Sequence, residues 1–516
     1  MKPFRAALCQ VPAHPIEDAE KNLQAILAAL DEAGEAGAQV VLLPECAYPA
    51  YYLRDANPYA RHNVRPYADV EDLLAERAKR YGYWIAAGLA VPHPSGGVTN
   101  SGVVFDATGE VRGQYDKSFL WHFDTNWFAR GREFPVFESE FATFGILICA
   151  DGRQPEVARS LAVKGAEVIF DLTAWVSWGR EPSQLTTTQC EYLMPVRARE
   201  NGVWVLAADK FGPEGDTLVY AGRSSVIDPL GNSRFCAPAD SPTVVVYDVE
   251  PMDIPQVPRR PALYRRLTEP TDSLPVSALL REPIVPAESN RRVAVVPAFE
   301  EFDAARTAAH YAELRAQDAD VVVFGGTTGP EGWQVALPTV ESAIRELGGA
   351  AVFAVATTGC SAHQSVVMVT PERTIEHAAT HGRGIQLGEI NAPVIETPAG
   401  NVGIMCGEEG FVPEVARTLM LEGADILAWS AFAPDPMTER FARARSDENR
   451  VYTAVAYADG AAIMAPTGAP LTVSPRGTGV SMAAQVNKAL SRWKDMAPGT
   501  NALTDRLAEA YWVLAG

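Results

Sequence analysis

An internal repeat is the feature that most constrains how this chain can fold. The pentapeptide PEVAR occurs at residues 155–159 and again at residues 413–417, and the sequences around the two copies also correspond. FGILICADGRQ precedes the first copy and VGIMCGEEGFV precedes the second. The other matching blocks occur in the same order in both halves. A repeat of about 230 residues is far longer than the unit of a solenoid, so the sequence predicts two copies of one domain.

Short apolar strands alternate with amphipathic helices along the first copy. Residues 38–45 have the pattern of a buried strand, and residues 18–36 and 70–81 have that of helices with one apolar face. Another helix is expected from Pro155 to Gly165, because proline suits the first helical position and glycine the position after the last one. This alternation predicts a layered α/β fold rather than a helical bundle or a β-sandwich.

A proline-rich segment separates the two copies. Residues 253–290 contain prolines at short intervals, which exclude a long helix or strand. We therefore expect a first domain over residues 1–252, a linker over 253–290, and a second domain over 291–516.

The charge balance excludes several classes of partner. The 516 residues include 44 Lys and Arg against 64 Asp and Glu, which gives a net charge of −20. Nucleic acids and anionic membranes attract the opposite sign, so neither is an expected partner. The seven cysteines form no CxxC pair and no metal-ligand spacing. Together with the absence of a signal-peptide pattern and of an apolar run of about 18 residues, this predicts a reduced, cytoplasmic protein without a bound metal.

Cys149 lies where an apolar strand passes into the helix that begins at Pro155. A thiol at such a turn projects from the strand end, and the backbone N–H groups that follow it can face a developing negative charge. The position therefore suits a nucleophile. An isolated buried cysteine can equally be a packing residue, so the surrounding residues decide between the two interpretations.

Three reactive residues of the first copy have no chemical counterpart in the second. Counted from PEVAR and from the matching strands, the pairs are Cys149 with Gly407, Glu45 with Gly326 and, if no gap intervenes, Lys117 with His381. The second copy keeps the hydrophobic residues of the strands and helices but lacks these three groups, so the fold does not depend on them. A thiol needs a base and a cationic field to become a good nucleophile. Glu45 and Lys117 can supply these, and Lys117 can also bind an oxyanion together with the N–H of Ala150.

Three motifs resemble the signatures of the nitrilase, or carbon-nitrogen hydrolase, superfamily: LPE at 43–45, DKSFLW around Lys117, and ILICADGRQPEVAR around Cys149. The resemblance implies a Glu45–Lys117–Cys149 triad on a four-layer α-β-β-α sandwich, without a metal or organic cofactor. It also implies that two such domains pair through their helices. The tandem chain would then be pseudo-dimeric, with a degenerate, non-catalytic second domain, and further homo-oligomerisation stays open.

The same resemblance indicates the substrate class. Nitrilases of this superfamily commonly have Trp-Glu after the nucleophile, whereas this chain has Ala150 and Asp151. That difference favours a small amide or N-carbamoyl substrate over a nitrile. Asp124 takes the position of a second, substrate-positioning glutamate, and Arg153 takes that of an arginine that binds a substrate carboxylate. The remaining expected pocket residues, which follow the strand at 167–174, are Trp175 and Trp178.

Alternatives remain for several of these assignments. Asp124 could simply cap a turn, and Arg153 could pair with Asp151 or Glu156. The whole protein could be a nitrilase or a non-catalytic scaffold, or it could transfer the acyl group to an amine. A different site could also be built in the second domain, around Cys406 and His381.

Overall fold

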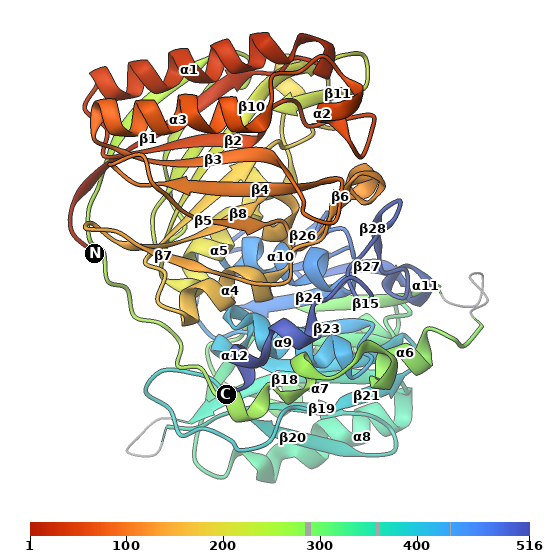
Figure 1. Ribbon diagram of the computed structural model, residues 1–516. Coiled ribbons are helices and arrows are strands. Elements are labelled where there is room, and N and C mark those ends of the chain that lie inside the picture. The colour runs from red at the N-terminus through yellow and green to blue at the C-terminus, as the bar shows by residue number, and fades with distance from the viewer. Residues whose placement is uncertain (284–289, 358–361, 434) are drawn as a thin grey trace. The chain divides into compact units, whose positions relative to one another are not determined.

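The computed structural model describes residues 1–283, 290–357, 362–433 and 435–516 (Figure 1). Cys360 therefore lies outside the described residues. The chain forms two compact units. The first contains Met1–Gln256 together with Ala497–Thr500 and Asp505–Val513, and the second contains Val257–Met496 together with Asn501–Thr504 and Leu514–Gly516. Two short segments of the predicted second domain (291–516) thus belong to the first unit, and the predicted linker belongs to the second unit from Val257 onward.

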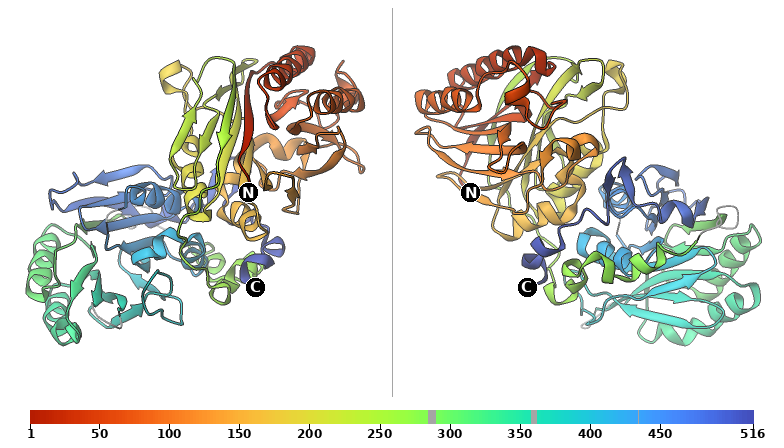
Figure 2. Two further views of the ribbon diagram at one scale, coloured as in Figure 1. Left: turned by 90° about the vertical axis from the view of Figure 1, so that its left-hand side faces the viewer. Right: turned by 45° about the vertical axis from the view of Figure 1, so that its right-hand side comes forward.

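The first unit has four layers. Its strands follow the order β5-β4-β3-β2-β1-β10-β9-β8-β7, and they face each other as two layers because β2 and β3 contact β9 while β4 contacts β8. Helices α1 and α3 lie side by side on the outer face of one layer, and α4 and α5 cover the other (Figures 1 and 2). The helices are α1 (Ala19–Glu35), α3 (Tyr67–Tyr81), α4 (Pro155–Val163) and α5 (Met194–Asn201). The main strands are β1 (Phe4–Pro12), β2 (Val40–Tyr48), β3 (Trp84–Pro92), β4 (Val98–Phe105), β5 (Val111–Asp116), β7 (Val136–Glu138), β8 (Thr143–Ile148), β9 (Val168–Thr173) and β10 (Trp204–Glu214).

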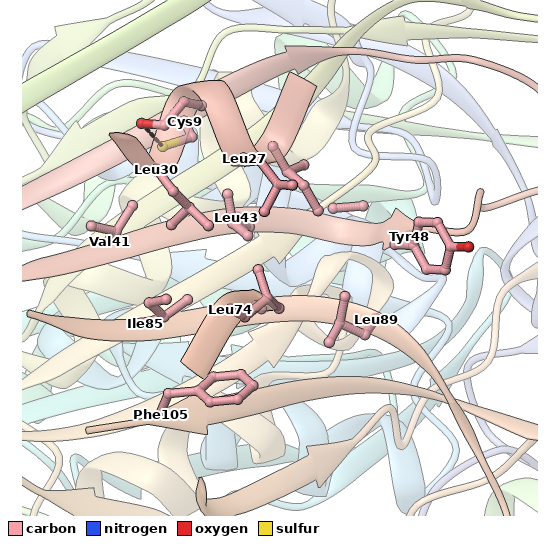
Figure 3. Close-up of a cluster of buried hydrophobic side chains, with 14 of the residues drawn as sticks. Cys9, Leu27, Leu30, Val41, Leu43, Tyr48, Leu74, Ile85, Leu89 and Phe105 are labelled. Atoms are coloured by element: carbon pink, nitrogen blue, oxygen red, sulfur yellow. Dashed lines mark hydrogen bonds between the residues drawn. The ribbon is translucent and has the colours of Figure 1, made fainter. Parts of the chain in front are cut away.

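The apolar faces expected from the sequence form the core between the helices and the first sheet. Leu27 and Leu30 of α1 pack over Val41 and Leu43 of β2, and Leu74 of α3 joins the same cluster (Figure 3). These side chains are all buried. The predicted helices at 18–36 and 70–81 are thereby confirmed, and the buried strand lies where residues 38–45 predicted it.

The second unit repeats these layers with two separate sheets. Their orders are β20-β19-β18-β16-β15-β27 and β21-β22-β23-β24-β25-β26, and β15 and β16 of one sheet contact β24 of the other. The helices are α7 (Ala304–Arg315), α8 (Leu337–Leu347), α9 (Pro413–Leu421) and α10 (Thr438–Asn449). The strands in these orders are β15 (Asn290–Val296), β16 (Val321–Phe324), β18 (Ala350–Thr357), β19 (Gln364–Val369), β20 (Thr374–Ala378), β21 (Val394–Thr397), β22 (Gly400–Cys406), β23 (Ile426–Ser430), β24 (Tyr452–Tyr457), β25 (Gly460–Met464), β26 (Pro470–Val473) and β27 (Met482–Asn487). Both copies therefore have the predicted layered α/β architecture.

A buried hydrogen-bond network explains why PEVAR is present in both copies. The arginine of each PEVAR donates to a main-chain carbonyl near the end of the next helix: Arg159 to Glu200, and Arg417 to Glu448, each at 2.9 Å. The side chains of these glutamates in turn accept from buried arginines at 2.6 Å, Glu200 from Arg197 and Glu448 from Arg445. Buried charges are tolerated when they are paired and hydrogen-bonded. The PEVAR segment thus contributes to the fold in both copies.

The segment between the copies contains only short elements, as its prolines predicted. These elements are three 3₁₀ turns (Pro261–Leu263, Arg265–Thr268 and Thr271–Ser273) and α6 (Pro275–Leu279). Residues 284–289 lie outside the described residues. Among the helices that the structure describes, none is both long enough and apolar enough to span a membrane.

A buried lysine in the second unit makes stability depend on pH. Burial lowers the pKa of Lys494 to about 7, although Asp425 opposes the shift. Its ammonium donates to the carbonyl oxygens of Asn449 and Arg450, at 3.0 and 3.1 Å. The folded pKa lies below the ordinary lysine value of about 10.4, so the unfolded chain binds more protons between these values. The free energy of unfolding should therefore rise with pH in this window.

The variant Lys494→Met removes this titration. For each pH unit above neutrality, we expect the free energy of unfolding of the wild type to rise by about 1 kcal/mol relative to that of the variant. Urea unfolding followed by tryptophan fluorescence at several pH values measures this difference. The control is Lys488→Met, which changes a partly exposed lysine of the same segment. A difference that stays constant from about pH 7 to pH 9 would contradict the prediction.

Candidate active site

Cys149 occupies a strained turn directly after β8. It begins the 3₁₀ turn Cys149–Arg153 with φ of +48°, a conformation that side chains other than glycine rarely adopt. Its N–H donates to Asp171 at 3.1 Å, and its carbonyl accepts from Gln189 at 2.5 Å. The equivalent residue of the second copy is Gly407, with φ of +55°, where the same turn carries no strain. The first copy thus retains a strained cysteine where a glycine suffices for folding, which is typical of a functional position.

Glu45 lies on β2 and is completely buried. Its Oε1 accepts hydrogen bonds from Asn100 Nδ2 at 2.6 Å and from Lys117 Nζ at 2.7 Å. Its Oε2 accepts from the N–H of Ala174 at 3.0 Å. Burial raises the pKa of Glu45 above the ordinary carboxyl value, although Lys117 opposes the shift. A carboxylate with a raised pKa is better matched to accept a proton near neutral pH.

Lys117 bridges two buried carboxylates. Its Nζ lies 2.7 Å from Glu45 Oε1 and 2.7 Å from Asp124 Oδ2. Burial alone would lower the pKa of Lys117, but Asp124, Glu45 and Cys149 outweigh it and raise the pKa well above the ordinary lysine value. The side chain therefore remains a cation inside the protein.

Asp124 has one of the two roles that the sequence left open, because it caps its own turn. Its Oδ2 accepts from the main-chain N–H of Trp121 at 2.9 Å, at the start of the 3₁₀ turn His122–Asn126, and the same oxygen accepts from Lys117. Its role in positioning a substrate stays a prediction. The cap fixes the carboxylate that orients the ammonium.

The thiol of Cys149 lies beside the residue that also contacts Glu45. Cys149 Sγ is 3.8 Å from the carbonyl oxygen of Ala174, whose N–H donates to Glu45 Oε2. Burial raises the pKa of Cys149 well above the ordinary thiol value; Glu45 adds to this shift, and Lys117 opposes it. The resting thiol is therefore neutral, and it requires a base in order to react.

Asp151 joins the cysteine turn to the lysine loop, a role that the sequence analysis did not assign. Its Oδ1 accepts from Ser118 N, Ser118 Oγ and Phe119 N at 2.7 to 3.1 Å. Its Oδ2 accepts from Tyr115 and from the N–H of Ile148 at 2.8 and 3.0 Å. The acid at the same distance before PEVAR in both copies, Asp151 and Glu409, was the signal that could have identified it.

The other expected pocket residues are not all brought together. Ala150 is the second residue of the turn, and residues at the start of such a turn do not use their N–H groups for bonds within it. Arg153 stacks on Trp121, with its guanidinium carbon 4.6 Å from the ring centre. Trp175 is buried, and its main-chain N–H donates to Asp209 Oδ1. Trp178 is 82% exposed, since it lies in the loop beyond β9 and outside this buried cluster.

The second copy shows that one sequence pairing was wrong. Ser118 donates to Asp151 with both its N–H and its hydroxyl, and Thr380 donates to Glu409 in the same way. The residue before each of them is Lys117 in the first copy and Ala379 in the second. Lys117 therefore corresponds to Ala379 and not to His381, because the connection that follows is shorter in the second copy.

In the second copy, other side chains occupy the space around Gly326 and Gly407, the counterparts of Glu45 and Cys149. A β-carbon built on Gly326 would lie 2.5 Å from the ring of Phe432, and one built on Gly407 would lie 2.4 Å from Gln364 Oε1. Non-bonded contacts to a β-carbon are almost never this short in real proteins. The second copy has thus lost both the reactive groups and the space for them.

Cys406 and His381 of the second copy do not form a comparable arrangement. His381 accepts or donates hydrogen bonds with Tyr264 at 2.7 Å and with Thr380 at 2.8 Å, and burial lowers its pKa. Burial raises the pKa of Cys406 well above the ordinary thiol value, with Glu409 adding to the shift. Groups of three or more potential metal ligands are absent from the residues the structure describes.

Comparison with known proteins gives one family for both halves. The family model for carbon-nitrogen hydrolases matches residues 5–259 and 363–495. A nitrilase of Pyrococcus abyssi is 32% identical over 238 residues, which cover 46% of this chain and 86% of that protein. An omega-amidase of Xenopus tropicalis is 27% identical over 261 residues, covering 48% of this chain and 90% of that protein. Among solved structures, an amidase from Nesterenkonia sp. is 29% identical, covers 48% of this chain and 90% of its own, and has a TM-score of 0.43.

Proposed function

The chain belongs to the carbon-nitrogen hydrolase family, and from this premise we propose that its first unit hydrolyses a small amide or N-carbamoyl compound through a thioester on Cys149. The observation that carries the proposal is the buried 2.7 Å pair of Glu45 and Lys117 beside Cys149. Removing two charges from water is costly, and this pair, unlike Arg197–Glu200, lies near a strained cysteine and has no counterpart in the second copy, which favours a chemical role. The similarity to an omega-amidase supports an amide substrate.

The proposed first half-reaction forms the thioester. Glu45 takes the proton of the Cys149 thiol, and the sulfur attacks the carbonyl carbon of the substrate. The Lys117 ammonium and the N–H of Ala150 stabilise the oxyanion of the tetrahedral intermediate. As the intermediate collapses, the C–N bond breaks, and the leaving nitrogen takes the proton from Glu45 and departs as ammonia or an amine.

The proposed second half-reaction consumes the thioester. Water gives a proton to Glu45 and attacks the thioester carbonyl, again with the oxyanion held by Lys117. The C–S bond then breaks, the acid leaves, and Cys149 recovers its proton. No step requires a metal or an organic cofactor.

We propose that the second unit is non-catalytic. Gly326, Ala379 and Gly407 replace the triad, and Phe432 and Gln364 fill the space. The second unit would then contribute by pairing with the first domain, as expected for a degenerate copy that is covalently linked to its partner.

A glutamine at position 45 tests the order of the steps. Glu45→Gln lacks the base of both half-reactions, so acylation should also be slow. A thiolate is a far better nucleophile than water, so hydrolysis should be slowed more than acylation, and prolonged incubation with an amide substrate should leave an acyl group on Cys149 that intact mass and peptide mapping detect. The same experiment with the double variant Glu45→Gln/Cys149→Ala should show no added mass. An acyl group found on Cys406 instead would contradict the assignment of the site to the first unit.

The choice of substrate distinguishes the proposed amide hydrolysis from the alternative that the protein is a nitrilase. A panel of primary amides, N-carbamoyl compounds and nitriles is expected to give higher kcat/KM for the first two classes. Higher values for nitriles would make the protein a nitrilase with the same triad.

A further inference from the structure

The loop that carries Lys117 and Asp124 is held by a segment almost 400 residues away in sequence. The Oγ1 of Thr500 accepts from the N–H of His122 at 2.7 Å and donates to the carbonyl oxygen of Leu120 at 3.2 Å. Thr500 is 1% exposed, and it belongs to the first unit with the rest of Ala497–Thr500. One buried hydroxyl thus bridges the two peptide groups on either side of Trp121.

One of these peptide groups is hydrogen-bonded to the charged residues proposed for catalysis. The N–H of Trp121 donates to Asp124 Oδ2, and the same oxygen accepts from Lys117 Nζ. His122 has φ of +50°, a conformation that costs free energy for a residue other than glycine and persists only when its surroundings fix it. The hydrogen bond from His122 to Thr500 supplies that constraint.

A second contact reaches the same loop from the C-terminal side. Arg130 Nε donates to the carbonyl oxygen of Ser118 at 2.5 Å, and its Nη2 donates to the carbonyl oxygen of Asp505. Tyr511 stacks on Phe134 with the ring centres 6.1 Å apart. Asp505 and Tyr511 also belong to the first unit. The C-terminal segments of the first unit therefore contact the loop directly at Leu120 and His122, and reach Ser118 through Arg130.

We propose that Thr500 is a positioning residue of the first unit's active site, acting through the loop from Leu120 to Asp124 on the Lys117 ammonium. This inference rests on the proposed function, since it assumes that the Lys117 ammonium stabilises the oxyanion and favours the Cys149 thiolate. Without the hydroxyl, the Trp121 N–H fixes Asp124 less firmly, and the ammonium is displaced from the place that Asp124 and Glu45 give it. Displacements of about 1 Å at such groups can lower rates by about two orders of magnitude.

The test compares two substitutions at position 500 with a matched control. Thr500→Val keeps the shape and removes the hydroxyl, whereas Thr500→Ser keeps the hydroxyl. Thr504→Val makes the same change at an exposed threonine four residues further on. For each protein, kcat and KM for an amide substrate, the pH profile of Cys149 alkylation by iodoacetamide, and the thermal midpoint are measured.

We expect Thr500→Val to lower kcat at least about 10-fold and to slow alkylation of Cys149 near neutral pH. Thr500→Ser and Thr504→Val should stay within about twofold of wild type. Wild-type values of kcat and alkylation in Thr500→Val would overturn the proposal. Equal losses in Thr500→Val and Thr500→Ser, together with a lower thermal midpoint, would also overturn it, because they indicate a packing role. If wild type hydrolyses no substrate, the proposed function fails, and alkylation of Cys149 alone still decides the role of Thr500.

Discussion

Replacing Cys149 with alanine is expected to lower kcat/KM by at least about 10⁴-fold while the protein stays folded. The proposed thioester forms on the Cys149 sulfur, which alanine lacks. The change removes one small buried atom, so the free energy of unfolding should move by about 1 kcal/mol or less. Steady-state kinetics and urea unfolding on the same preparation measure both quantities.

Cys406→Ala is the matched control for this variant. Cys406 is as deeply buried as Cys149 and lies one residue before the equivalent turn of the second copy. Turnover in Cys406→Ala should equal that of wild type. Substantial hydrolysis by Cys149→Ala, or loss of hydrolysis in Cys406→Ala, would contradict the proposed site.

The turn at Cys149 could be predicted because its main signals are local. The apolar strand that ends at Ile148 and Pro155 at the first position of α4 lie within a few residues of it, and the repeat supplies a second copy of the same short stretch with Gly407 in place of Cys149. The pairing of Glu45 with Gly326 was also confirmed. In each copy the central strands pair in the same register, with Val40 opposite Trp84 and Val321 opposite Ala350.

The counterpart of Lys117 could not be predicted in the same way. It follows an edge strand, and the connection from there to the next sheet differs in length between the copies. Loops tolerate such changes because they contribute few buried contacts. Only the hydrogen bonds to Asp151 and Glu409 show that Ala379 takes the place of the lysine.

Two further features depend on three-dimensional proximity and leave no pattern in the sequence. Trp178 follows a buried strand at a spacing that suited a pocket wall, but β9 ends at Thr173, and the main-chain N–H of Ser177 already donates to the carbonyl oxygen of Val219. Thr500 contacts Leu120 and His122 across more than 370 positions, and hydroxyl residues in a C-terminal segment carry no signal of such a contact. Long-range contacts of this kind become visible only in the folded structure.

Lys117→Met is expected to lower kcat/KM by at least about 10³-fold and to destabilise the first unit by about 3–5 kcal/mol. The ammonium is the hydrogen-bond partner that Glu45 and Asp124 share, and both carboxylates are completely buried. Without it, one of them must take up a proton or remain as an uncompensated buried charge. The base is then protonated or misplaced, and the oxyanion loses its cation.

The double variant Lys117→Met/Asp124→Asn separates stability from catalysis. Removing the Asp124 charge relieves the repulsion with Glu45, which keeps its hydrogen bonds from Asn100 and Ala174. The free energy of unfolding should therefore recover in part, whereas kcat/KM should not. Recovery of kcat/KM along with stability would show that Lys117 acts only by holding the fold.

Lys210→Met provides the matched control, because it removes another completely buried lysine of the first unit. Its Nζ donates to the carbonyl oxygen of Cys46 at 2.8 Å and lies 3.6 Å from Glu214 Oε2. We expect a loss of stability here too, since Glu214 keeps its hydrogen bonds from Tyr52 and Tyr220 but loses its buried cation. The folded fraction, assayed well below its unfolding temperature, should keep kcat within about 10-fold of wild type. A loss in Lys210→Met as large as that in Lys117→Met would mean that any buried cation of this unit is equally important for turnover, and Lys117 would then have no special role at the oxyanion.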